Sequence, residues 1–266
     1  MDARHCPDGR CVMRTIDLNC DCGEGFGPYR MGDDAAMLGI VTSINAACGF
    51  HAGDPEIMAR IFKAAKEKGV AIGAHPGFPD LWGFGRRKLP LTAGEVERIV
   101  AYQTGAALGL AAYAGARLTH VKPHGALSNM AAEDEAAARA IARAVKAIDP
   151  SLAFLAPAQT KLEAEALAQG LKVAREIYAD RAYAEDGLLM PRSQPGAVLR
   201  DPEEAAARAT EMVLEGAIIT ASGRRIATQI DSICVHGDTP NAVLMARAVR
   251  ARLEQAGVTI APFAQV

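Results

Sequence analysis

Four of the six histidines in this chain share one setting, because each follows a short apolar run and has glycine close by. In a protein of repeated strand–helix units, the segments after the strands open on one common face, where residues distant in sequence meet. Imidazole acts as a general acid or base, as a hydrogen-bonding group for substrate, or as a metal ligand. The spacing therefore predicts a single active site built around four strand ends, with these histidines: His51, His75, His124 and His236.

The segment 118–125 adds a lysine to this set. Strand alternation places His120, Lys122 and His124 on one face. A lysine at the carboxyl end of a barrel strand can hold a carboxylate or a phosphate, or act as a base if it is desolvated. We expect Lys122 and His124 to belong to the site, and His120 to be a hydrogen-bonded residue of the core.

The segment 15–27 has the highest density of polar groups in the chain. Alternation sends Asp17, Asn19 and Asp21 to the side opposite the apolar residues. We expect Asp17 to be a structural carboxylate, and Asn19 and Asp21, nearer the strand end, to be functional. Asp21 with His51 and His75 would also make a divalent-metal triad, so metal binding, acid–base chemistry and substrate binding all stay open for the histidines.

Two further segments carry cations. Residues 76–91 form a connection far longer than the roughly two to six residues usual between strand and helix, and they include Arg86 and Arg87. Guanidinium groups bind phosphate through paired hydrogen bonds, although a solvated basic turn fits the spacing equally well. Asp180 and Arg181 follow a later apolar run, where they either rim the pocket or form exposed loop charge.

Short apolar stretches alternate with alanine-rich helical patterns along the chain. Short buried strands that alternate with helices indicate parallel pairing through right-handed crossovers, and seven such units favour a closed barrel over an open sheet. We predict one α/β domain, a seven-stranded (β/α) barrel over residues 13–266, with a hairpin at 217–230 and a mobile extension at 1–12. The predicted strands are 15–20, 43–48, 70–75, 118–122, 152–156, 171–177 and 231–235.

Capping sequences mark where the helices begin. An N-cap carboxylate followed by proline occurs at Asp54 and again at Asp201, and Thr92 is followed three residues later by glutamate, as in a capping box. Thr239-Pro240 is expected to start the last helix.

Composition excludes several classes of protein. The 29 basic and 31 acidic residues give a formal charge of −2 without a basic tract, so nucleic acid is not an expected partner. No apolar run is long enough to cross a bilayer and no secretory signal is present, so we expect a cytoplasmic protein without a membrane partner. The six cysteines are too sparse for a disulfide framework and are expected to be free thiols.

Five sequence blocks, in order along nearly the whole chain, resemble the signatures of the LamB/YcsF family, the A-subunit family of bacterial 5-oxoprolinase. Departures are small: Cys22 stands where a larger apolar residue is common, and Ser128 where an aromatic residue is usual. The blocks are Asp17–Asp21 with Gly23-Glu24, Asn45–Asp54, Gly73–Gly77 through Gly85–Arg87, Val121–Leu127 and Ala179–Tyr183.

This resemblance implies an irregular, TIM-barrel-like (β/α) barrel related to the glycoside hydrolase/deacetylase superfamily. It implies a hydrolase that opens 5-oxo-L-proline, a cyclic amide, to L-glutamate with ATP and Mg²⁺, together with partner subunits B and C. A lactam is a stable amide, so water attack requires a strong electrophile on the carbonyl oxygen or conversion of that oxygen into a leaving group. Phosphorylation by ATP achieves the second.

Roles for individual residues follow from the resemblance and the chemistry together. The alternative function is a stand-alone metal-dependent deacetylase or amidohydrolase that uses Asp21, His51 and His75 as ligands, and a third is a non-catalytic binding protein. Under the first hypothesis the catalytic residues are Asp21, Lys122 and His124, the substrate-binding residues are Asn19, Asn45, His51, His75 and His236, and the phosphate-binding residues are Arg86, Arg87 and Arg181.

Overall fold

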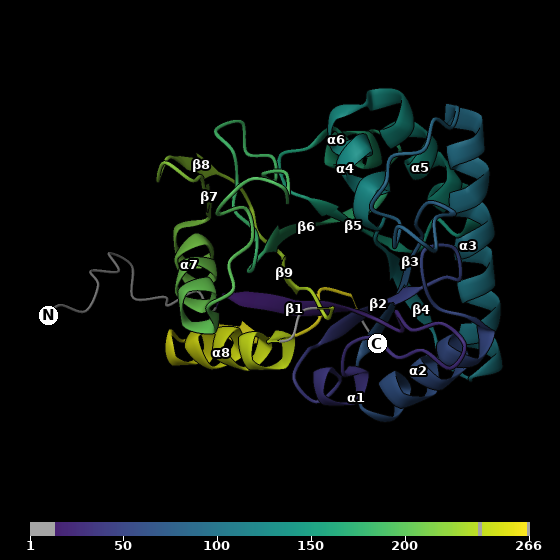
Figure 1. The fold of residues 1–266 in the computed structure, drawn as a ribbon, viewed down its shortest axis with the longest axis horizontal. Coiled ribbons are helices and arrows are strands. Elements are labelled where there is room, and N and C mark those ends of the chain that lie inside the picture. Colours follow the sequence, from purple (N-terminus) through teal and green to yellow (C-terminus); the bar gives the residue numbers. More distant parts are fainter. Residues whose placement is uncertain (1–13, 239–240, 265–266) are drawn as a thin grey trace, which may run out of the picture.

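The computed structural model describes residues 14–238 and 241–264 and contains a closed barrel of parallel strands (Figure 1). Neighbouring strands pair in the order β1-β2-β3-β4-β5-β6-β9, and β9 also pairs with β1, which closes the ring. The predicted seven-stranded (β/α) barrel is therefore confirmed. The strands are β1 (Thr15–Cys22), β2 (Ser43–Ala47), β3 (Ala71–His75), β4 (Leu118–Val121), β5 (Ala153–Pro157), β6 (Lys172–Tyr178) and β9 (Ser232–Val235).

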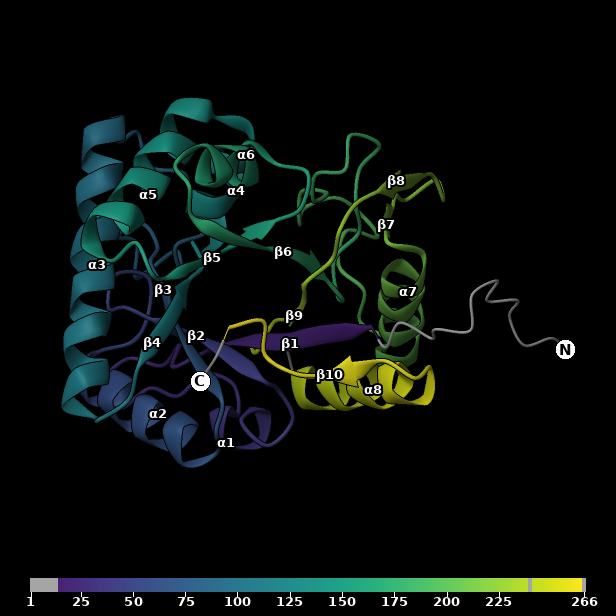
Figure 2. The ribbon, with the colours of Figure 1, turned by 180° about the vertical axis from the view of Figure 1, so that it is seen from behind.

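Helices surround the barrel, with α3 and α5 on one side and α7 and α8 on the opposite side in both views (Figures 1 and 2). Their apolar faces and the outward side chains of the strands form one core, because alternate residues of a barrel strand point toward the helices. The helices are α1 (Asp34–Met37), α2 (Pro55–Glu67), α3 (Ala93–Tyr113), α4 (Gly125–Glu133), α5 (Glu135–Ile148), α6 (Lys161–Ala168), α7 (Pro202–Glu215) and α8 (Ala242–Gln255).

The predicted caps are present. The Asp54 carboxylate accepts a hydrogen bond from the N–H of Ile57 at the start of α2, Asp201 caps α7 in the same way, and Thr92 forms a full capping box with Glu95. The predicted start of the last helix at residues 239–240 lies outside the described residues, and α8 begins at Ala242. The extension at 1–12 lies outside them as well.

Three short strands complete the fold. The hairpin at 217–230 is confirmed as antiparallel β7 (Ala217–Ile219) and β8 (Arg225–Ala227). The sequence did not indicate β10 (Thr259–Ile260), which pairs with the first residues of β1, because two residues carry no detectable alternation. The hairpin replaces a simple link between α7 and β9, and this makes the barrel irregular.

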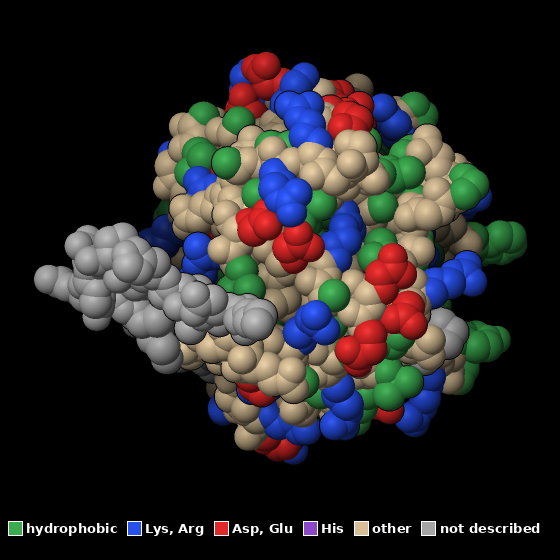
Figure 3. All heavy atoms as spheres, turned by 90° about the vertical axis from the view of Figure 1, so that its left-hand side faces the viewer, with side chains coloured by type: hydrophobic (Ala, Val, Ile, Leu, Met, Phe, Trp, Pro, Cys, Tyr) green, Lys and Arg blue, Asp and Glu red, His purple; other side chains and the backbone are tan. Residues whose placement is uncertain are grey.

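The molecular surface carries mixed charge. On the side of the molecule where α7 lies, basic and acidic side chains are interspersed (Figure 3), as the near balance of charges in the sequence implies. Within the part of the chain that the structure describes, no helix has both the length and the apolar character needed to cross a membrane.

Inside the barrel, Asp17 is the structural carboxylate that alternation predicted. Its oxygens accept hydrogen bonds from the hydroxyls of Thr42, Ser43 and Ser232, and the side chain is fully buried. Burial raises the pKa of Asp17 to about 6, since the three hydroxyl donors only partly offset the loss of water. The ionised form is therefore costly at neutral pH.

We expect Asp17→Asn to flatten the pH dependence of stability. Between about pH 4 and 6 the folded chain keeps a proton that the unfolded chain has released, so stability falls as the pH rises through this window. Asparagine does not titrate, so the loss of unfolding free energy from pH 4 to pH 7 should be about 2 kcal/mol smaller in the variant. Urea unfolding at both pH values measures this difference. The prediction would be contradicted if the unfolding free energy changed by the same amount between pH 4 and pH 7 in the wild type and the variant.

Candidate active site

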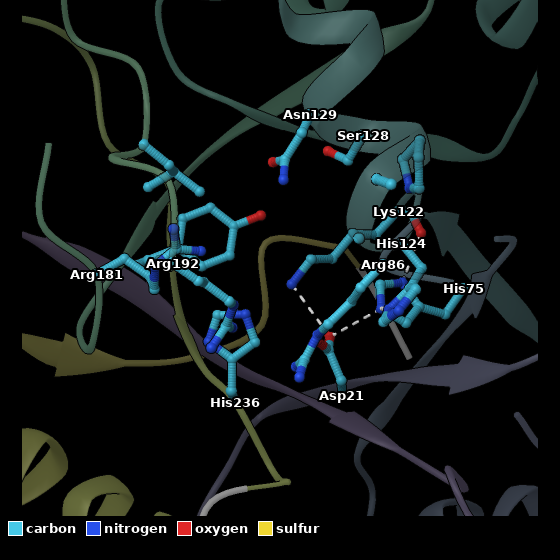
Figure 4. A pocket seen from close by; sticks show the side chains of 15 residues that line it. Asp21, His75, Arg86, Lys122, His124, Ser128, Asn129, Arg181, Arg192 and His236 are labelled. Carbon is cyan, nitrogen blue, oxygen red and sulfur yellow. Dashed lines mark hydrogen bonds and ion pairs between the residues drawn. The ribbon is translucent and has the colours of Figure 1, made fainter. Parts of the chain in front are cut away.

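A pocket of about 310 Å³ opens at the carboxyl ends of the barrel strands (Figure 4). Most of the predicted site residues meet there, although they are spread over more than 200 positions of the sequence. The common face expected for the strand ends is therefore present. The predicted residues that line the pocket are Asp21, His75, Arg86, Lys122, His124, Arg181 and His236.

Lys122 occupies the bottom of this pocket and is buried. Its ammonium lies 3.1 Å from the Asp21 carboxylate, 2.9 Å from Glu176 and 3.0 Å from the Cys234 sulfur. Burial alone lowers the pKa of a lysine, but the two carboxylates outweigh burial and raise the pKa of Lys122 well above its usual value. Lys122 is therefore a fixed cation, which favours the anion-holding interpretation over the neutral base.

Asp21 is the charged partner that faces the pocket (Figure 4). Burial raises the pKa of a carboxylic acid, but His75 and Lys122 outweigh burial and hold the pKa of Asp21 well below its usual value. The carboxylate also accepts a hydrogen bond of 3.0 Å from the Asn45 amide and lies 3.4 Å from His75 Nε2. Asp21 is thus an ionised acceptor next to the Lys122 ammonium.

Asn19 and Asn45 lie deeper in the barrel and do not line the pocket. The Asn19 amide donates to Glu176 (2.9 Å) and Ser232 (2.8 Å), and its oxygen accepts from Asn45 (2.8 Å). The same oxygen lies 3.3 Å from the Lys122 ammonium. These two side chains therefore form a supporting network that fixes the lysine and its carboxylates. His120 belongs to this layer, as expected of a hydrogen-bonded core histidine.

Three of the histidines form a compact cluster. The ring of His51 stacks on that of His124 with centroids 3.7 Å apart, and His75 meets both edge-on. His124 Nδ1 lies 3.0 Å from His75 Nε2, while the other nitrogen of each ring faces a backbone carbonyl. His51 is fully buried behind His124 and does not line the pocket. Burial lowers the pKa of both His51 and His124.

The long connection at 76–91 covers this cluster. The Phe84 carbonyl accepts a hydrogen bond of 2.8 Å from His124 Nε2, and the Phe84 ring meets the imidazoles of His51 and His124 edge-on. Gly85 has φ of +62°, and a Cβ there would lie 2.7 Å from His51 and 2.8 Å from His124. Only glycine lets the backbone approach the rings this closely. The predicted contribution of this loop to the site is consistent with these contacts.

The predicted cations divide into two sets. Arg86 lines the pocket and forms an ion pair of 2.7 Å with Asp238, whereas Arg87 is mostly exposed, pairs with Asp80 and does not line the pocket. Arg181 lines the pocket, and its guanidinium also donates to loop carbonyls, including that of Ala197. Arg87 therefore holds the loop together and does not reach the pocket.

His236 lies on the wall of the pocket opposite His75 and His124 (Figure 4). Its Nδ1 is 2.8 Å from the Asp180 carboxylate, and its ring stacks on Tyr178 with centroids 5.3 Å apart. Asp180 therefore sets the tautomer of His236 through Nδ1, and Nε2 is the ring nitrogen that does not contact Asp180. Tyr178 in turn lies 5.2 Å from the Lys122 ammonium, so this wall is continuous with the charged floor.

Sequence reasoning missed several groups of the site. Glu176 and Tyr178 occupy inward positions of β6, and Cys234 occupies one of β9, so the alternation rule used for β1 would have found them. Glu24 was part of a recognised block without an assigned role. Arg192 lies on an irregular stretch after β6, where no period signals its position.

The fold and the pocket define a (β/α)-barrel protein with a charged, enzyme-like site at the carboxyl ends of its strands. The sequence model of the LamB/YcsF family matches residues 16–266, so this chain belongs to the LamB/YcsF family. The A subunit of 5-oxoprolinase from Rhodopseudomonas palustris is 57% identical over 254 residues, which cover 95% of this chain and 100% of that relative.

Two other relatives agree with this assignment. The A subunit of 5-oxoprolinase from Azorhizobium caulinodans is 59% identical over 255 residues, which cover 95% of this chain and 100% of that relative. The crystal structure of a lactam utilization protein from Thermus thermophilus superposes with a TM-score of 0.88 at 48% identity, covering 94% of this chain and 100% of that one.

Proposed function

We propose that this chain is the A subunit of a 5-oxoprolinase, which opens 5-oxo-L-proline to L-glutamate at the expense of ATP together with partner subunits B and C. The names of the relatives support the substrate and the division into subunits. The observation that carries the proposal is the pairing of the Lys122 ammonium with the Asp21 carboxylate in a pocket with additional arginines. Because ATP is consumed, we place the reaction in the cytoplasm.

The overall reaction joins two hydrolyses. The lactam carbonyl oxygen takes the γ-phosphoryl group of ATP as the bond to ADP breaks, and the lactam nitrogen loses its proton. One water molecule then adds at the ring carbon, and the carbon–nitrogen bond breaks as the nitrogen takes up both protons of that water, which yields an acyl phosphate and a free amine. A second water molecule releases phosphate and leaves glutamate. Phosphoryl transfer and the attack of water place negative charge on oxygen, so these steps benefit from fixed cations and from one proton acceptor.

The residues at the pocket suit these tasks. Lys122 and Arg86 neutralise the charge on phosphoryl oxygens, and Asp21 accepts the proton from the lactam nitrogen or from water. The first turn of α4, which begins at Gly125, lines the pocket, so the positive end of the helix dipole favours an anion there. His124 Nε2 donates to a carbonyl and its Nδ1 faces His75, so we assign no proton transfer to His124.

Arg192 is proposed to bind the substrate carboxylate. It lines the pocket near Arg181, whose guanidinium already serves the loop carbonyls. We expect Arg192→Met to raise the KM for 5-oxoproline by about 10- to 100-fold, with a smaller change in kcat, because the lost contact is made equally in the ground state and the transition state. Steady-state glutamate release measures this split. The exposed Arg200→Met is the matched control, and an unchanged KM for Arg192→Met would remove Arg192 from substrate binding.

Omission of single components tests the proposed function. Glutamate release from 5-oxoproline is measured with this chain, the two partner subunits, ATP and Mg²⁺, and then with each of these left out in turn. We expect release only in the complete mixture, with ATP hydrolysis that depends on 5-oxoproline. Turnover that is indifferent to the partners or to ATP would contradict the proposal.

A second candidate function is a metal-dependent hydrolase that acts without ATP. One observation favours it, namely the close group of Glu24 and three histidines beside the pocket. The omission assay separates the two candidates, because this alternative predicts amide cleavage by the chain alone that is lost on chelation and does not respond to ATP.

A further inference from the structure

Four buried side chains from the ends of four different strands converge on one point next to the pocket. Each offers a ligand atom, and these atoms all lie within 4.8 Å of one another. All four side chains are buried, so solvent has little access to their nitrogens and oxygens. The group, named here the histidine cluster, consists of Glu24, His51, His75 and His124.

Two lone pairs face each other in the histidine cluster. A carbonyl oxygen can only accept, so His75 Nδ1 carries the proton that it donates to the Lys122 carbonyl (2.7 Å), and His124 Nε2 carries the one that it donates to Phe84 (2.8 Å). In the neutral rings, His75 Nε2 and His124 Nδ1 are therefore both unprotonated, yet they lie 3.0 Å apart. Some positive species must lie between or beside them.

Other atoms of the histidine cluster also lack partners. Among the described residues, Glu24 Oε1 and both ring nitrogens of His51 are buried without a hydrogen bond. Glu24 Oε1 lies 3.7 Å from His51 Nε2 and 3.8 Å from His124 Nδ1. A buried polar atom without a partner costs about 1–3 kcal/mol, so this arrangement is unfavourable as it stands. A shared proton would bridge the two facing nitrogens but would leave Glu24 Oε1 without a partner.

We propose that the histidine cluster is a binding site for one divalent transition-metal ion, with Glu24, His75 and His124 as the protein ligands. Ligand atoms on a tetrahedral ion with bonds of about 2.1 Å are about 3.4 Å apart, and the measured separations of 3.0 and 3.8 Å bracket this value. Two imidazoles and a carboxylate suit Zn²⁺, Co²⁺ or Ni²⁺ better than Mg²⁺. The site is therefore distinct in chemistry from any site for the Mg²⁺ of ATP.

His51 supports this site from behind. Its ring is parallel to that of His124 within 4°, so an ion in the plane of one ring lies outside the plane of the other. The lone pair of an imidazole lies in the ring plane, and His51 is therefore not assigned as a ligand in this arrangement. The carbonyls that bond His75 and His124 fix the metal-binding tautomers, as the hydrogen-bond partners of histidine ligands do in known metal sites.

A second group of potential ligands is less suitable. Asp21, Cys234 and His236 also lie close together. However, the Lys122 ammonium is 3.1 Å from Asp21 and 3.0 Å from the Cys234 sulfur, so a second cation would be repelled there. Asp21 is the carboxylate of the metal triad that the sequence left open as an alternative, and for an ion in the histidine cluster Glu24 takes its place.

Metal binding without turnover tests the proposal. The chain is purified, stripped with a chelator and titrated with Co²⁺, while the visible absorption of bound Co²⁺ and competition by Zn²⁺ are recorded. We expect one ion per chain. Glu24→Gln and His124→Gln should weaken binding more than about 100-fold, beyond the usual effect of changing a group that only orients a ligand. The matched control His236→Gln should stay within about threefold of the wild type, since only the other group uses His236.

Folding is checked by circular dichroism and by thermal unfolding. Saturating Zn²⁺ at about 100 times Kd should raise the Tm of the wild type by about 5–10 °C and leave that of Glu24→Gln unchanged, because the ion binds only the folded chain. Absence of stoichiometric binding would overturn the proposal in favour of a shared proton. Binding that survives His124→Gln and fails in His236→Gln would also overturn it. Neither result depends on 5-oxoprolinase activity.

Discussion

Lys122→Met is expected to abolish glutamate release by the complete enzyme, with a loss of at least about 1,000-fold in kcat. The ammonium of Lys122 is the buried cation at the bottom of the pocket, and it is fixed by Asp21 and Glu176 before any substrate arrives. Methionine fills nearly the same volume without charge, so phosphoryl oxygens would enter a pocket floor that carries two uncompensated carboxylates. The measurement is glutamate release with saturating ATP and the partner proteins.

A paired variant separates catalysis from stability at this position. Removing one member of a buried ion pair typically costs about 3–5 kcal/mol, so Lys122→Met is also expected to unfold at lower urea concentration. Adding Glu176→Gln removes one carboxylate and restores the local charge balance, which should recover much of the stability while activity stays lost. Recovery of turnover in the double variant, or near-normal turnover in the single one, would remove Lys122 from the mechanism.

The barrel was predictable because its signals are local and repeated. Seven apolar runs with helical segments between them leave few arrangements that bury both faces of each strand, and the caps at Asp54, Thr92 and Asp201 fix where helices begin. The pairing of β1 with β9, which closes the barrel, needed no separate sequence signal. The free edge of the seventh parallel strand forms its hydrogen bonds with the free edge of the first.

The site was only partly predictable, because strand alternation predicts whether a side chain points into the barrel but not how deep inside the barrel it lies. Alternation correctly predicted that Asn19 and Asp21 point into the barrel. The two side chains lie in different layers, however, and for this reason Asn19 bonds to Glu176 while Asp21 faces the pocket. Depth depends on the stagger between strands, and a single sequence does not reveal it. Loop conformation was equally hidden: nothing in the spacing of Arg86 and Arg87 showed that only the first reaches the pocket.

Asp21→Asn is expected to lower glutamate release by at least about 1,000-fold while leaving the fold intact. The pKa of Asp21 is held well below its usual value by His75 and Lys122, in spite of burial, so the wild-type group is an ionised proton acceptor throughout the neutral range. Asparagine has the same shape but cannot accept a proton. Lys122 keeps Glu176 as its partner, so the loss of stability should be smaller than for Lys122→Met.

The control for Asp21→Asn is Asp201→Asn, an exposed carboxylate at the N-cap of α7. Asparagine caps a helix about as well as aspartate, so this variant loses one negative charge without losing a structural contact and should retain activity. Substrate binding provides the decisive second measurement. If Asp21 moves a proton, the affinity for 5-oxoproline should change far less than kcat, because the carboxylate acts during the chemical step. A variant that loses affinity and keeps kcat would show instead that Asp21 only positions the substrate.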